Sequence, residues 1–269
     1  LTKEQLAAEP PAAQEADEDR AAYYDRAVSR LGWCIKNFGG YQKKIMRDVF
    51  FEAFETYETG CAPVIQELAR GVAPEQQTQL LGRAAAAMLD ELEAGWQKKG
   101  DMEDEKIVLA IFFVPMVRKQ QLPISEEFVT ILQKQWVERY PKSPFYLGDY
   151  ESISGGFRKK FLGLCFITTA VCQELGKPDD CEELTAFRAF RDGYLRSQPD
   201  GEALIREYYN IAPGIVTCIN TCSDRHASYA RIREEYLAPC YQDLLAGRNE
   251  SCKARYVRMV RDLEREYLS

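Results

Sequence analysis

The sequence is poor in the residues on which common enzyme chemistry depends. It has a single histidine, His226, among 269 residues, and histidine is the usual acid–base and metal-binding side chain near neutral pH. It also lacks a Walker loop, a dinucleotide fingerprint, a His-Glu-x-x-His motif and a Gly-x-Ser-x-Gly elbow. These absences leave enzyme status open but favour a non-enzymatic protein, and we expect no cofactor and no metal.

Long apolar runs are also missing. The longest, at 107–117, has eleven residues, which is too short to span a bilayer and typical of a buried helix. The start, LTKEQLAAEPPAAQ, lacks the basic and apolar regions of a secretion signal, and nine cysteines are an odd number for a disulfide framework. We therefore expect reduced cysteines and a cytoplasmic protein without membrane segments, with a signal upstream of Leu1 left open.

The charge is weak and unevenly placed. The net charge is −7, and residues 1–25 carry seven acidic side chains against Lys3 and Arg20. The rest of the chain is therefore close to balance, which speaks against binding nucleic acid through bulk electrostatics. The sequence gives no indication of an oligomeric state.

What the chain does have is helix-forming residues with apolar side chains at three- and four-residue spacing. We expect an all-α fold, a multi-helix bundle of two packed sub-bundles, with one possible short extended segment near 164–169, where Phe, Ile and Thr are adjacent. The segment PKSPFYLGDYESISGG contains two prolines and three glycines and reads as a boundary. The predicted division is a flexible acidic tail, an N-terminal bundle, a linker and a C-terminal bundle, at 1–15, 16–140, 141–156 and 157–269.

Two motifs of the second half resemble a known family. Residues 165–170 read CFITTA, and residues 187–195 read FRAFRDGYL. Over about 164–219 the chain resembles the bacterial family named for its CFI box, with Thr168 where that box has alanine and Cys172-Gln173 where it has an aromatic residue and glycine. The resemblance implies a bacterial origin and a helical C-terminal unit, and the family has no established activity to carry over.

Arg191 is the most unusual residue of this stretch. A helical period places it inside an apolar face, with Arg188 at the border of that face. A buried guanidinium is costly unless hydrogen bonds replace its water. Arg191 is therefore either half of a structural ion pair or a receptor for an anion or carboxylate, and both arginines are candidate binding residues.

Cys165 is the candidate catalytic residue. If a helix begins near Thr168 or Thr169, their hydroxyls would cap it and its positive end would lower the pKa of the thiol. The alternative is a core cysteine, since free cysteine is often buried. A nucleophile would need a base, and His226 is the one histidine available. Thr168 and Thr169 are the remaining candidate binding residues.

Two further patterns are weaker. Cys218, Cys222 and His226 are spaced by four, but zinc sites use closer pairs, and a helix break expected at 220–224 would scatter them. The last helix has arginines along one arc, which is either a solvated face or a docking strip for an acidic partner or the chain's own acidic tail. These arginines are Arg255, Arg258, Arg261 and Arg265.

The predicted function is that of a bacterial helical binding protein that recognises a partner protein or a small anionic ligand. One alternative is a thiol-dependent enzyme with Cys165 as nucleophile. Another is a redox-responsive interaction protein, because seven of the nine cysteines lie after residue 156.

Overall fold

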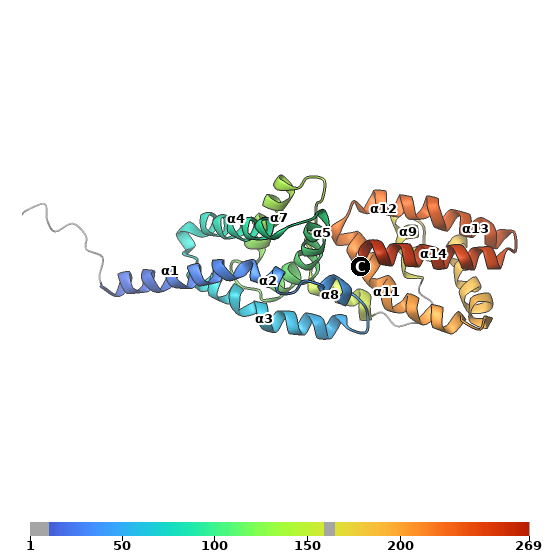
Figure 1. The fold of residues 1–269 in the computed structure, drawn as a ribbon, viewed down its shortest axis with the longest axis horizontal. Helices are drawn as coiled ribbons and strands as arrows, with labels where there is room; N and C mark the ends of the chain where they lie inside the picture. The colour runs from blue at the N-terminus through green and yellow to red at the C-terminus, as the bar shows by residue number, and fades with distance from the viewer. Residues whose placement is uncertain (1–10, 159–164, 269) are drawn as a thin grey trace, which may run out of the picture.

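The computed structural model describes residues 11–158 and 165–268. Throughout these ranges the regular structure is helical and contains no strand. The predicted all-α class is therefore confirmed. Figure 1 shows an elongated molecule in which α1–α7 form one group of helices, the first sub-bundle, and α9–α14 form another, the second sub-bundle. Their division into separate domains stays a prediction.

The first sub-bundle is built on long helices that pack side by side. Helix α1 lies along α3 and α4, and α4 lies along α7. Its α-helices are α1 (Pro11–Leu31), α2 (Trp33–Lys36), α3 (Phe50–Gly71), α4 (Gln77–Gly95), α5 (Lys99–Val108), α6 (Val114–Lys119) and α7 (Ser125–Arg139). Its short turns are η1 (Tyr41–Lys44), η2 (Pro74–Gln76) and the π-helical η3 (Leu109–Phe113) between α5 and α6.

An aromatic cluster fills the core of the first sub-bundle. Phe112, on η3, is fully buried, and its ring lies 5.1 Å from that of Tyr41, 5.7 Å from Phe50 and 5.6 Å from Tyr57. Aromatic pairs at such distances add to the free energy gained from burying their surface. The apolar run that the sequence marked as a core helix therefore lies at the centre of this sub-bundle.

The second sub-bundle contains shorter helices around one long central helix. Helix α8 (Tyr150–Arg158) precedes it, and its own helices are α9 (Phe166–Glu174), α10 (Glu182–Ala189), the π-helical η4 (Phe190–Tyr194), η5 (Leu195–Ser197), α11 (Gly201–Cys222), α12 (Arg225–Ile232), the π-helical η6 (Arg233–Leu237), α13 (Ala238–Leu245) and α14 (Asn249–Tyr267). Helix α11 packs against α9 and α14 within this half and against α5 and α8 on its other side.

Helix α11 also joins the two sub-bundles through its backbone. Arg47 N donates to Asn210 O at 3.0 Å, and Tyr146 N donates to Thr221 O at 2.7 Å. Gly214 lies so close to the carbonyl of Ile45 that a Cβ there would stand 1.9 Å from the oxygen. A glycine is required at this point because any side chain would push the two sub-bundles apart.

Three sequence-based predictions need correction, and the first two concern the linker and the tail. The linker predicted at 141–156 ends in a helix, since α8 begins at Tyr150, and it also carries the fully buried Phe145. Of the flexible tail predicted at 1–15, residues 1–10 lie outside the described residues, and from Pro11 the chain is helical. At 141–156 proline and glycine predicted irregular chain, but packing of α8 against α6 and α11 overrides that preference.

The extended segment expected near 164–169 is wrong for the part that is described. Leu164 lies outside the described residues, Cys165 is non-helical, and α9 begins at Phe166. Ile167 and Val171 are buried at helical spacing, so tertiary burial of one face outweighs the β-propensity of Phe, Ile and Thr. Within the described ranges, no helix combines the length and apolar character needed to cross a bilayer.

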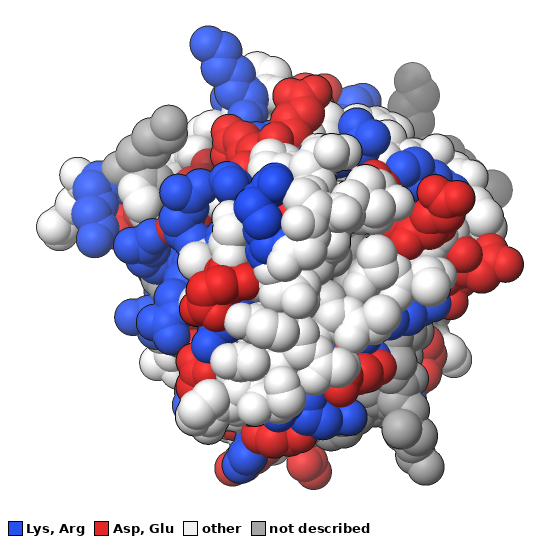
Figure 2. Space-filling model, turned by 90° about the vertical axis from the view of Figure 1, so that its right-hand side faces the viewer, with Lys and Arg blue, Asp and Glu red and all other residues white. Residues whose placement is uncertain are grey.

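The free end of the second sub-bundle carries both signs of charge. Figure 2 shows a broad uncharged area there, with mostly basic side chains along one margin and acidic ones along the other. One sign of charge does not dominate this face.

Candidate functional site

A small apolar cavity lies between α10, η4, α11 and α14. Its volume is about 50 Å³. Apolar side chains form the walls, namely Phe187, Phe190, Leu195, Leu204, Ile205, Val257 and Val260. Cys165, Arg191, Tyr208 and Tyr256 also line it, as do Glu207 and Arg261, whose side chains are largely exposed. The structure therefore brings Cys165 and Arg191, the two most singular residues of the sequence, to one site.

Arg191 reaches the site through a local change of helix type. It lies in η4, a π-helical turn that directly continues α10, and such turns rotate the residues that follow relative to an α-helix. The side chain is buried, with 9% of its surface exposed. The sequence placed Arg191 on an apolar face, and that prediction is confirmed.

Arg191 forms hydrogen bonds with Asp192, Tyr209 and Cys165. Nε donates to Asp192 Oδ1 at 2.8 Å and Nη2 donates to Oδ2 at 2.6 Å, which makes a bidentate pair with the next residue. Nη1 donates to Tyr209 OH at 2.9 Å and to Cys165 Sγ at 3.6 Å. These hydrogen bonds hold the pKa of Asp192 below its usual value. The arrangement favours the structural ion pair over the anion receptor.

Cys165 lies at the start of α9 with its thiol covered. The residue is 4% exposed, and this burial raises the pKa of the thiol, although Arg191 opposes the rise. The thiol is therefore protonated near neutral pH, which is the less nucleophilic form. The environment is that of a core cysteine beside a cavity.

Thr168 and Thr169 do not cap a helix, contrary to the sequence-based prediction. Helix α9 begins two residues before Thr168, and Tyr208 OH accepts the hydrogen bond of Ile167 N at 3.0 Å in place of a cap. Thr168 Oγ1 lies 3.2 Å from Tyr256 OH, which ties α9 to α14. Tyr208, from a distant helix, thus performs the capping that local sequence assigned to the threonines.

Arg188 lies apart from the cavity. Its guanidinium donates to the carbonyl of Asp179 at 2.7 Å and to Asp179 Oδ1 at 2.9 Å. These bonds fasten α10 to the loop that precedes it. The structure therefore separates the two arginines that the sequence grouped as one binding pair.

His226 belongs to a different surface. It lies on α12 with its side chain 80% exposed, and its Nδ1 contacts the Glu174 carboxylate, which also pairs with Arg225 Nε at 3.0 Å. Glu174 and Thr169 line a larger polar groove of about 590 Å³ between α8, α9, α11 and α12. In the described part of the chain no hydrogen bond or ion pair connects His226 to Cys165.

The remaining candidates from the sequence are Cys218 and Cys222 and the arginine arc of the last helix. Cys218 and Cys222 are buried on α11, and no group of three His, Cys, Asp or Glu side chains within 11–158 and 165–268 is placed to share a metal ion. The arginine arc of α14 has partners inside the protein. Its pairings are Arg255 with Asp243, Arg261 with Glu207, Arg265 with Asp262, and Arg258 over the ring of Tyr236.

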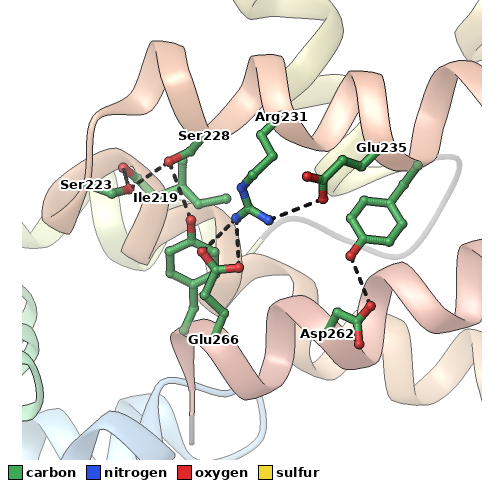
Figure 3. A network of polar contacts seen from close by, with 9 residues as sticks. Ile219, Ser223, Ser228, Arg231, Glu235, Asp262 and Glu266 are labelled. Atoms are coloured by element: carbon green, nitrogen blue, oxygen red, sulfur yellow. Dashed lines mark hydrogen bonds and ion pairs between the residues drawn. The ribbon is translucent and has the colours of Figure 1, made fainter. Parts of the chain in front are cut away.

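A polar network holds α14, one wall of the cavity, in place. Figure 3 shows Arg231 of α12 between Glu235 and Glu266, with Nη2 donating to the two Glu266 oxygens at 2.6 and 2.7 Å. Further along, Tyr236 OH donates to Asp262 Oδ2 at 2.9 Å. The network fixes α14 against α12 and η6, so the cavity is bounded by elements that are themselves braced.

Sequence reasoning missed the tyrosines of the site. Tyr208, Tyr209 and Tyr256 all touch the groups around Cys165, yet in the sequence each fits an ordinary amphipathic helix. The adjacent pair Tyr208-Tyr209 was the one local signal, because neighbouring positions on a helix are about 100° apart and two aromatic residues there widen its buried face.

No protein-family model, no curated protein and no solved structure matches this chain. The resemblance to the CFI-box family and the bacterial origin that it implies stay predictions.

Proposed function

We propose that this chain is a non-enzymatic binding protein whose cavity between η4, α11 and α14 accepts an apolar group about the size of an amino-acid side chain. The observation that carries the proposal is the composition of the cavity wall. Seven apolar side chains surround a space of about 50 Å³. A void of this kind favours an apolar occupant because its lining otherwise lacks contact partners on one side.

The size of the cavity limits what it can hold. Pockets for drug-sized ligands are usually about 300–1,000 Å³, several times the volume found here. An anchor that fills a small pocket is also the usual centre of a protein–protein interface. The occupant is therefore either a very small apolar molecule or a single apolar side chain of a partner protein.

An anionic occupant has less support than the sequence suggested. An anion at Arg191 would have to displace Asp192, which already makes two short hydrogen bonds to the guanidinium. Glu207 adds a second negative charge among the lining residues. The thiol-dependent alternative is weaker still, because burial keeps the Cys165 thiol protonated.

The test uses xenon as a probe of the cavity in the full chain, because benzene binds in engineered cavities of about 150 Å³, and this cavity is about 50 Å³. Amide NMR signals of the lining residues should shift as xenon is added to the wild-type protein. Val257→Phe places a ring at the partly exposed edge of the cavity and should abolish the shifts. Leu245→Phe, at a position 64% exposed and outside the lining, is the matched control and should behave as wild type.

Native mass spectrometry of the same variants distinguishes the two possible occupants, a very small apolar molecule and an apolar side chain of a partner protein. A bound small molecule that is lost from Val257→Phe identifies a free ligand. Xenon binding without any co-purifying molecule points to a partner's side chain. The absence of xenon-induced shifts at the lining residues of the wild type would overturn the proposal.

A further inference from the structure

The structure places six of the cysteines in neighbouring pairs. The Cys61 thiol donates to the Cys34 carbonyl and the Cys240 thiol to the Cys252 carbonyl, each at 3.9 Å, and Cys172 and Cys181 lie near each other at the two ends of one loop. The four cysteines of the first two pairs are completely buried. Cys172 and Cys181 differ, because Cys181 is partly exposed while Cys172 is 1% exposed.

A short, well-fixed loop brings Cys172 and Cys181 together. Cys172 lies in the last turn of α9, and Cys181 is the residue directly before α10. Lys177 N donates to the carbonyl of Cys172 at 2.9 Å, and Cys181 N donates to that of Pro178 at 3.1 Å. Gly176 supplies the left-handed turn, with φ of +67°.

Side chains reinforce this loop at both ends. Lys177 Nζ bonds Glu183 Oε2 at 2.5 Å, and Cys172 Sγ lies 3.9 Å from the same oxygen. The two bonds from Arg188 to Asp179 hold the middle of the loop against α10. The braced turn therefore holds the Cys172 thiol against the first turn of α10, directly after Cys181.

We propose that Cys172 and Cys181 form a reversible disulfide when the protein meets a peroxide. The Cys181 sulfur attacks one peroxide oxygen, so that an S–O bond forms, the O–O bond breaks and the leaving oxygen departs as water. The Cys172 sulfur then attacks the resulting sulfenic acid; the S–S bond forms, the S–O bond breaks and a second water leaves. Two thiols lose two electrons in total, and one hydrogen peroxide is reduced to two waters.

The order of the two steps follows from exposure. Cys181 is the member of the pair that solvent reaches, and susceptibility to oxidation follows access. Burial, the charge of the adjacent Cys181 and a hydrogen bond with it raise the pKa of Cys172 to about 12. Cys172 therefore acts second, on a sulfenic acid that forms beside it.

The experiment treats the native full chain with hydrogen peroxide and maps its thiols by mass spectrometry. Digestion after glutamate is required, because Glu174 lies between the two cysteines, whereas Lys177 precedes a proline that blocks trypsin. We expect a pair of linked peptides carrying Cys172 and Cys181, two thiols lost, and full reversal by dithiothreitol.

Two variants make the result specific. Cys181→Ser, at a partly exposed position, should fold as wild type and leave Cys172 unmodified. Cys61→Ser removes a member of a buried pair and should leave the Cys172–Cys181 link intact. The proposal is overturned if Cys181 proceeds to sulfinic acid with Cys172 still reduced, or if a buried pair links first. The xenon assay is independent of these outcomes, so the two proposals can fail separately.

Discussion

The two sub-bundles differ in packing around Phe112 and around Arg191. In the first, large aromatic side chains around Phe112 meet ring to ring and are fully buried. In the second, buried polar groups such as Arg191, Thr168 and Asp243 are satisfied by specific partners, and an apolar cavity is left between α11 and α14. The aromatic cluster is close-packed, whereas the side chains that line the cavity lack contact partners on one side.

The largest expected effect comes from truncating the centre of the sealed core. Phe112→Ala should lower the free energy of unfolding by about 3–5 kcal/mol, because the lost transfer energy is joined by the energy of the cavity left behind. Ile205→Ala, in the wall of the existing cavity, should cost about 2 kcal/mol, since this side chain already lacks neighbours on one side. Urea denaturation measures both. Equal losses would contradict the contrast between the sub-bundles.

Removal of the buried charge should have the next largest effect. Arg191→Met deletes the bonds to Asp192, Tyr209 and Cys165 and should lower stability by about 2 kcal/mol. Arg188→Met, whose guanidinium is more exposed, should cost less than about 1 kcal/mol.

The difference in stability between the wild type and Arg191→Met should also depend on pH. Because Arg191 lowers the folded-state pKa of Asp192, the pair stabilises the fold above the unfolded pKa of about 3.9. That contribution disappears as the pH falls through the lower folded pKa. Urea midpoints of wild type and Arg191→Met should therefore converge in acid, and a gap that stays constant down to the lowest pH would argue against the ion pair.

The smallest expected effect comes from adding one methylene group to each of the two cores. Val260→Ile lines the cavity and should raise the free energy of unfolding by up to about 1 kcal/mol, because it fills empty space. Val64→Ile, at a fully buried position on α3, should lower it by about 1 kcal/mol through overpacking. Thermal melts of the pair give the sign, and the same sign in both would remove the contrast.

Parts of the site were readable in the sequence. The helical period alone placed Arg191 on an apolar face, and its burial followed. The same reasoning failed at Thr168 and Thr169, because the start of α9 is decided by Tyr208, 41 positions away. A cap from such a distance has no local signature.

The sequence by itself determined the helical class, the core position of 107–117 and the final helix with its arc of arginines, because periodicity and helix propensity are local properties. The tertiary structure decided which residues meet. It placed Cys165 beside Arg191, turned part of the expected linker into α8, and left a cavity between α11 and α14. These outcomes depend on how helices far apart in the chain pack against each other, and the spacing of residues along one helix carries no record of that.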